Sequence, residues 1–308
     1  MKPMLVAVLL QVLSAPDPAQ MEKAPDLGYI AVQHGLRLPD GLTLGAPSAV
    51  AVTSGGHLIV FNRGDHPIVE FDADGKFIRS MGEGLYARPH GMRIDPEGNI
   101  WTTDVAGHTV TKMSPQGQVL LVLGTKGQSG DWNEAAGSRL LNEPNDLAFG
   151  SAGVVFVVEG HGRGEPRVLK FDKTGKLLTT WGGKGAGPGQ FDIAHSVVVD
   201  GQGLVYVADR QNRRVQIFDG DGKYSKEWKY AGLPCGLFLG PGGQMYLATG
   251  FAGQILKLDL AGKAVAATGQ PGKALGEFGE AHYLTLGRQG EIYVADTVNP
   301  GLQKFVKK

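Results

Sequence analysis

The sequence predicts an all-β, six-bladed β-propeller with four-stranded antiparallel blades around a central channel. First, one unit recurs six times along the chain. Second, each complete unit holds four short apolar runs separated by Gly-, Asn- or Asp-containing turns, a pattern typical of antiparallel strands. Third, no window of about 11–18 residues shows a convincing helical period. Units of this length with four strands each favour propeller blades.

The second and fourth units show the pattern in full. In the second, strands are expected at PHGMRID, IWTTD, TVTKM and VLLVLG. In the fourth, they are expected at AHSVVVD, LVYVADR, RVQIFD and YSKEW. The last unit ends at LQKFVKK, which leaves room for only three strands. We expect residues 29–37 (YIAVQHGLR) to complete that blade, because such closure removes an exposed sheet edge.

Each unit has a residue at the start of its first strand, the mouth residue, and a residue at the end of its second strand, the exit residue. These lie 14 residues apart in all six units: Ser48/Asn62, His90/Asp104, Asn145/Glu159, His195/Asp209, Cys235/Thr249 and His282/Asp296. In an antiparallel hairpin the start of one strand lies beside the end of the next. The mouth residues are therefore expected at one end of the channel, with the exit residues beside them.

Three mouth residues are histidines: His90, His195 and His282, in units two, four and six. Alternate blades of a six-fold ring would let their imidazoles converge on the axis. Three imidazoles with an open fourth position form the pattern of a catalytic zinc site, although other divalent first-row metals also accept imidazole. The sequence thus predicts a site for Zn²⁺ or another divalent first-row metal. The alternative is three histidines that plug the channel by hydrogen bonding.

Arg63 and Arg210 directly follow exit residues, so both are expected at the same mouth. Their guanidinium groups can grip a carboxylate or stabilise charge on an oxygen, unless they are surface arginines paired with loop carboxylates. His161 follows Glu159 by two residues and is either a general base or a solvated loop histidine. Cys235 could lie near the metal, but lone cysteines are usually small buried hydrophobes.

Composition narrows the functional classes. The chain has 308 residues and zero net charge, and its scattered Lys and Arg residues lack an aromatic platform, which argues against nucleic acid. Residues 1–20 have the layout of a secretory signal peptide, with Lys2 before an apolar run too short to span a membrane; a buried strand is the alternative. We therefore expect a propeller at 21–308, no stable membrane span after signal removal, a periplasmic or extracellular location, and a monomer.

The repeats resemble the NHL repeat family, and within it the peptidyl-α-hydroxyglycine α-amidating lyases, also called peptidylamidoglycolate lyases. The resemblance covers nearly all of the chain after the predicted signal. It is carried by IVFNRGDH (59–66), RPHGMRID (88–95), NIWTTDVAGH (99–108), GPGQFDIAHS (187–196) and YVADRQNRRVQIF (206–218).

The resemblance implies a metal-dependent lyase that cleaves the C–N bond of a peptidyl- or acyl-α-hydroxyglycine to give an amide and glyoxylate. The family's three metal-binding histidines match His90, His195 and His282, and its active-site arginines match Arg63 and Arg210. The family has a tyrosine base where this chain has His161. The imidazole replaces the phenol as base, or the chemistry is altered or lost.

Two further departures concern cofactors and partners. The family has a calcium-binding aspartate at the position of Tyr283, which makes a structural Ca²⁺ doubtful here. No residues remain for a second catalytic domain, so any hydroxylating partner would be a separate enzyme. The expected substrate is a small molecule or the C-terminus of a peptide. The alternatives are a lactonase-like metal-dependent hydrolase on the same propeller and a non-enzymatic NHL scaffold that binds a partner protein.

Overall fold

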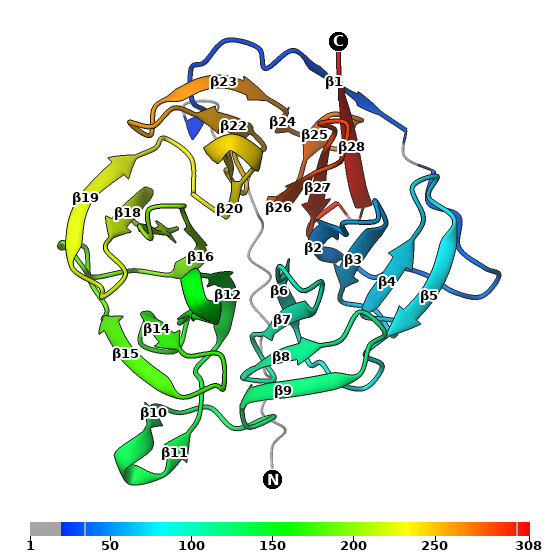
Figure 1. Ribbon diagram of the computed structural model, residues 1–308. Helices are drawn as coiled ribbons and strands as arrows, with labels where there is room; N and C mark the ends of the chain where they lie inside the picture. Colours follow the sequence, from blue (N-terminus) through cyan, green and yellow to red (C-terminus); the bar gives the residue numbers. More distant parts are fainter. Residues whose placement is uncertain (1–19, 34, 300) are drawn as a thin grey trace, which may run out of the picture.

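The computed structural model describes residues 20–33, 35–299 and 301–308, and it has the predicted six-bladed architecture (Figure 1). Six four-stranded antiparallel sheets are arranged around a central channel. Helical structure in the described ranges is limited to short 3-10 turns. None of these helices is long and apolar enough to cross a membrane. The predicted signal peptide lies outside the described residues, apart from Gln20, and stays a prediction.

Each blade is one antiparallel sheet. Blade 1 contains β2 (Pro47–Val52), β3 (Leu58–Asn62), β4 (Ile68–Phe71) and β5 (Phe77–Met81). Blade 2 contains β6 (Pro89–Ile94), β7 (Ile100–Asp104), β8 (Thr109–Met113) and β9 (Val119–Gly124). Blade 3 contains β12 (Pro144–Phe149), β13 (Val155–Glu159), β14 (Arg167–Phe171) and β15 (Leu177–Gly182). Blade 4 contains β16 (Ala194–Val199), β17 (Val205–Asp209), β18 (Arg214–Phe218) and β19 (Tyr224–Lys229). Blade 5 contains β20 (Gly236–Leu239), β21 (Met245–Ala248), β22 (Ile255–Leu258) and β23 (Ala264–Thr268). Blade 6 contains β26 (Ala281–Leu286), β27 (Ile292–Asp296), β28 (Gly301–Lys307) and β1 (Tyr29–Val32).

The loops carry short elements outside the blades. These are β10 (Trp132–Asn133), β11 (Ser138–Arg139), β24 (Gln270–Pro271), β25 (Glu277–Phe278), η2 (Glu134–Ala136), η3 (Ser151–Gly153) and η4 (Pro241–Gly243).

The ring closes as predicted, with an N-terminal strand completing the last blade. β1 pairs antiparallel with β28, from Tyr29 opposite Lys307 to Val32 opposite Lys304. The strand is shorter than the expected 29–37, because Arg37 instead forms a bridge with Lys76 of blade 1. The N-terminal region therefore ties blade 6 to the rest of the ring and covers its outer edge.

The turns between the outer strands explain why the sequence carries repeated Asp-Gly-Lys signals. The Asp72 carboxylate accepts the backbone N–H groups of Asp74 and Lys76, at 3.0 and 2.9 Å. Asp219 does the same for Asp221 and Lys223, at 3.0 and 2.9 Å. An aspartate that satisfies the backbone of its own turn fixes the register of the flanking strands.

The apolar core lies between neighbouring blades. One cluster joins Ile59 and Phe61 of blade 1 to Met92, Ile100 and Met113 of blade 2. Analogous clusters occupy the other inter-blade spaces. Because each inner strand is packed between its neighbours, residues that project from it into the channel are held by a rigid scaffold.

Candidate metal centre

A β-bulge directs the mouth residue out of the ladder and towards the channel. In blade 4, Ala194 lies opposite Asp209 and Ser196 lies opposite Ala208, so His195 has no partner in the ladder. In blade 1, the same register shift releases Ser48. Comparable shifts occur at the starts of β6, β12 and β26. An extra residue at a bulge re-aims a side chain. Blade 5 keeps the spacing of 14 residues without this shift, and its mouth residue Cys235 directly precedes β20.

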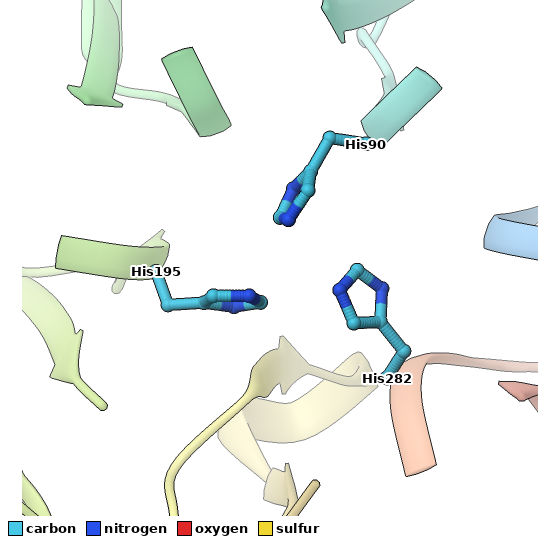
Figure 2. Close-up of side chains that lie close together, drawn as sticks. All are labelled: His90, His195 and His282. Atoms are coloured by element: carbon cyan, nitrogen blue, oxygen red, sulfur yellow. The ribbon is translucent and has the colours of Figure 1, made fainter. Parts of the chain in front are cut away.

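The structure brings His90, His195 and His282 together at one end of the channel, from blades 2, 4 and 6 (Figure 2). One ring nitrogen from each lies within 4.8 Å of the others. The ring centroids of His90 are 4.7 Å from those of both other imidazoles, and the remaining pair is 5.1 Å apart. All three side chains are buried. The spacing suits three ligands around one ion.

Each imidazole is anchored by the next blade. The Nδ1 atom of His90 is 2.8 Å from the backbone oxygen of Asn145, and that of His195 is 2.8 Å from the backbone oxygen of Cys235. The Nδ1 atom of His282 is 2.7 Å from the backbone oxygen of Ser48. A carbonyl can only accept, so this network assigns the proton to Nδ1 and leaves Nε2 with a free lone pair. That is the usual arrangement of a metal-binding histidine.

The Nε2 atoms show that the residues fit a metal ion. The Nε2 atom of His90 is buried and has no hydrogen-bond partner among the described residues. The Nε2 atom of His195 lies 3.9 Å from the Sγ atom of Cys235. Buried polar atoms in native proteins are rarely left unpaired. Three convergent imidazole nitrogens would satisfy this requirement by binding a divalent cation such as zinc.

The electrostatics keep the three histidines in their ligand form. Burial lowers the pKa of His90 and of His195 far below the usual value of 6.5, assisted by neighbouring imidazoles and, for His195, by Arg210. Burial also lowers the pKa of His282 to about 4, although Glu280 partly offsets the effect. Neutral imidazoles at neutral pH can bind a cation without first releasing a proton.

The exit carboxylates stabilise the loops rather than orient the imidazoles. Asp104 accepts the backbone N–H groups of Ala87 and Arg88, at 2.6 and 2.7 Å. Asp209 accepts the backbone N–H of Asp192 at 2.8 Å. An acid at the exit position therefore serves the backbone of its own blade.

The two predicted arginines have different surroundings. Arg210 is buried, forms an ion pair with Glu280, and lies over the ring of Phe251 at 5.4 Å. Glu280 in turn accepts the hydroxyl of Thr297. Arg63 is half-buried and makes no ion pair among the described residues; its Nε atom donates to the backbone oxygen of Pro89 at 3.3 Å. Of these two arginines, Arg63 is thus the one with a guanidinium available to an anion.

His161 lies beside the three buried histidines. Its ring centroid is 4.9 Å from that of His90 and 5.7 Å from that of His195. The loop after β13 that carries His161 is held by Glu143, which accepts the backbone N–H of Gly162 at 2.8 Å. Burial, with help from nearby arginines, lowers the pKa of His161 to about 3. The imidazole is therefore neutral at ordinary pH and a weak base.

Cys235 lies beside the histidines, as the sequence allowed, and Glu280 adds to the predicted set. Cys235 is fully buried, and burial raises the pKa of its thiol, so the thiol stays protonated. Glu280 appears in the sequence only as a neighbour of His282, and no sequence signal connects it to Arg210, which lies 70 residues away. The backbone carbonyls that anchor the histidines leave no sequence signal at all.

The residues at the position of the family's calcium do not fit that ion. Tyr283 is buried and donates its phenol hydroxyl to the backbone oxygen of His195 at 3.0 Å. The guanidinium of Arg93 lies over the Tyr283 ring at 5.4 Å. Calcium prefers six to eight oxygen ligands, usually including carboxylates. The Tyr283 hydroxyl carries no charge, and the buried carboxylate of Asp146 is already paired with Arg93.

The fold and the geometry of the site define a class of protein, namely a six-bladed propeller with three imidazoles at one mouth of its channel. The NHL repeat model matches residues 191–218. Human NHL repeat-containing protein 3 is 32% identical over 287 residues, which cover 85% of this chain and 80% of that protein. The chain therefore belongs to the NHL repeat family.

Other relatives carry enzyme names. Mouse peptidyl-glycine alpha-amidating monooxygenase is 34% identical over 263 residues, which cover 73% of this chain and 26% of that protein. A probable peptidyl-alpha-hydroxyglycine alpha-amidating lyase of Caenorhabditis elegans is 31% identical over 202 residues, which cover 57% of this chain and 56% of that protein. The chain thus spans about a quarter of the mouse relative and just over half of the nematode one.

Solved structures share the architecture at low sequence identity. A streptogramin B lyase structure has a TM-score of 0.65 and 15% identity, covering 91% of this chain and 98% of that chain. A gluconolactonase of Xanthomonas campestris has a TM-score of 0.63 and 16% identity, covering 85% and 86% of the respective chains. These likenesses concern the fold alone.

Proposed function

We propose that this protein is a metal-dependent lyase that cleaves the C–N bond of a peptidyl- or acyl-α-hydroxyglycine, giving an amide and glyoxylate. The observation that carries the proposal is the set of three buried imidazoles whose Nδ1 atoms are all anchored by carbonyls, leaving three Nε2 atoms for one ion. The names of the mouse and nematode relatives support the choice of reaction.

His90, His195 and His282 would hold Zn²⁺ or another divalent first-row metal. When bound, such an ion supplies Lewis-acid chemistry and lowers the pKa of a hydroxyl that it contacts. Three protein ligands with a further position for water or substrate are typical of catalytic zinc sites, and the three imidazoles would supply that number of ligands.

The arginines would place the substrate carboxylate. Arg63 is the better candidate for direct binding, because it is only half-buried and makes no ion pair in the described part of the chain. A guanidinium can bind a carboxylate with two parallel hydrogen bonds. Arg210 is already paired with Glu280, so it contributes a fixed, partly neutralised cation beside the histidines.

His161 would accept the proton. The substrate hydroxyl loses its proton to the neutral imidazole, and its oxygen becomes the aldehyde oxygen of glyoxylate. The C–N bond breaks, and the amide nitrogen takes up a proton. Because the pKa of His161 is about 3, it can assist only a hydroxyl that has already been made more acidic.

The test is metal content and glyoxylate release on one purified sample, with α-hydroxyhippurate as the substrate. We expect the protein to hold a metal ion and to release glyoxylate and benzamide in equal amounts. His90→Ala should lose both metal and activity. Metal-loaded protein that cleaves lactones but forms no glyoxylate would favour the hydrolase. Purified protein that holds no transition metal would contradict both enzyme functions and favour the non-enzymatic scaffold.

His161 needs its own variants. His161→Phe keeps a planar ring and removes the base, so metal content should stay and glyoxylate release should fall. His161→Tyr introduces the residue type found in the family resembled and should retain activity. If His161→Phe were as active as the native protein, His161 would not be the base.

We also infer export as a monomer, with any hydroxylation of the substrate performed by a separate enzyme. The predicted signal peptide at 1–20 supports export. N-terminal sequencing of the mature protein, together with its mass in solution, tests both points; an intact Met1 on protein inside the cell would contradict export.

A further inference from the structure

A second polar layer crosses the channel just beyond the histidines. It consists of Arg93, Asp146, Ser196 and Tyr283, from the inner strands of blades 2, 3, 4 and 6. Asp146 and Ser196 are fully buried, and the Arg93 side chain is 15% exposed. We call these four residues the axial layer. Buried charges in the middle of a propeller need a physical reason.

Arg93 and Asp146 form the centre of the axial layer. The Nε and Nη2 atoms of Arg93 lie 3.1 and 2.5 Å from the two carboxylate oxygens of Asp146. Nη2 also donates to the backbone oxygen of Leu237 in blade 5, at 3.0 Å. The hydroxyl of Ser196 donates to Asp146 at 2.7 Å. One guanidinium therefore links blade 2 to blades 3 and 5, and its carboxylate partner extends the link to blade 4.

Tyr283 connects the axial layer to the histidines. Its hydroxyl reaches across the channel from blade 6 to the backbone oxygens of His195 and Asn145, at 3.0 and 3.4 Å. The oxygen of Asn145 also faces the Nδ1 atom of His90. Arg93 lies over the Tyr283 ring. The backbone oxygens of His195 and Asn145 are thus already engaged by donors.

We propose that the Arg93 guanidinium is the built-in cation of the propeller axis, so that five blades are joined beneath the histidines without a structural calcium ion. A buried carboxylate requires a counter-charge, and a planar guanidinium meets a carboxylate with two hydrogen bonds. Arg93 thus supplies a positive charge and directed hydrogen bonds beside Tyr283, the position at which the resemblance implies a calcium ligand. This role does not depend on the proposed lyase activity.

Two observations agree with this role. Burial alone would lower the pKa of Arg93, but the Asp146 carboxylate outweighs burial and raises it, so the charge is permanent. Arg93 also lines a cavity of about 640 Å³ at the end of the inner strands opposite the histidines. A small cation in solution could reach the axial layer through that cavity if Arg93 were truncated.

The experiment uses zinc-loaded full-length protein and measures its thermal midpoint and its calcium content. We expect no bound calcium after gel filtration in millimolar CaCl₂ and no calcium-dependent rise in Tm. Arg93→Ala should lower Tm, and methylguanidinium should restore part of the loss at a concentration that leaves the native Tm unchanged. Equal concentrations of NaCl or CaCl₂ should restore none.

Matched variants distinguish charge from packing. Arg93→Met combined with Asp146→Asn should lower Tm less than Arg93→Met alone, because the double variant leaves no unpaired carboxylate. If Arg93→Ala does not fold, Arg93→Lys serves, and it should be less stable than the native protein because it cannot form the two-pronged contact. The proposal would be overturned if the native chain bound one calcium ion with a raised Tm, or if calcium restored the Tm of Arg93→Ala. It would also be overturned by an unchanged Tm in Arg93→Ala or in Arg93→Lys.

Discussion

The mouth residue has one role in the even-numbered blades and a different role in the odd-numbered blades. In blades 2, 4 and 6 the mouth residue is a histidine whose ring points into the channel. In blades 1, 3 and 5 it is Ser48, Asn145 or Cys235, and its backbone oxygen faces the Nδ1 atom of the preceding blade's histidine. Each neighbouring pair of blades therefore supplies one ligand and its anchor.

The comparison teaches why three histidines are found in a six-fold ring. An imidazole needs a partner behind it to fix its tautomer and direction. If every blade carried a histidine, six rings would compete for the space on the axis. Alternation converts the six-fold scaffold into three copies of a ligand-and-carbonyl pair. The side chain of the mouth residue should thus matter greatly on even blades and little on odd ones.

The largest effect is expected on an even blade. His195→Ala removes a ligand, so metal affinity should fall by more than about 100-fold, beyond the usual cost of losing a group that only orients a ligand. Metal content after dialysis measures this. Ser48→Ala is the control, because it keeps the backbone oxygen that faces His282. Full metal content in His195→Ala would refute the three-histidine site.

A smaller effect is expected from the arginine on blade 1. Arg63→Ala should raise KM for α-hydroxyhippurate by about 10- to 100-fold, the equivalent of about 1.5–3 kcal/mol for a charge-assisted hydrogen bond. Arg210→Ala should instead reduce both kcat and stability, since it leaves Glu280 buried without its partner. Steady-state kinetics and thermal unfolding of both variants test this difference between the two arginines. Equal increases in KM in the two variants would contradict it.

Acid should destabilise the metal-free protein through the even-blade histidines. Their folded-state pKa values lie below the unfolded value of 6.5, and that of His282 is about 4. The unfolded chain therefore binds more protons as the pH falls from 6.5 towards 4, and stability declines by up to about 1.4 kcal/mol per pH unit for each such histidine. Urea unfolding at several pH values measures the slope. His282→Asn should reduce it, and an unchanged slope would contradict the assignment.

The smallest effect is expected from an odd-blade side chain. Cys235→Ser keeps the backbone oxygen that faces His195. Metal content should be unchanged, and activity per metal-loaded molecule should stay within about threefold, less than about 0.7 kcal/mol. Loss of metal in this variant would mean that the thiol itself is a ligand.

The sequence predicts the repeat, the ring closure and the convergence of the histidines because these depend on local patterns. The offset of 14 residues marks the hairpin in every blade, and it marks the bulge in blades 1, 2, 3, 4 and 6. The carbonyl anchors could not be predicted, since every residue has a backbone oxygen. The Arg93–Asp146 pair was also missed, because its partners lie 53 residues apart and meet only when the ring closes.

The measurement that tests the central claim most directly is zinc-edge X-ray absorption on the purified protein, followed by the glyoxylate assay on the same sample. We predict a zinc ion with three imidazole ligands and at least one exchangeable position, together with glyoxylate release from α-hydroxyhippurate. Four protein ligands around the zinc with no glyoxylate, or protein that holds no metal after purification with zinc, would contradict a catalytic centre built on His90, His195 and His282.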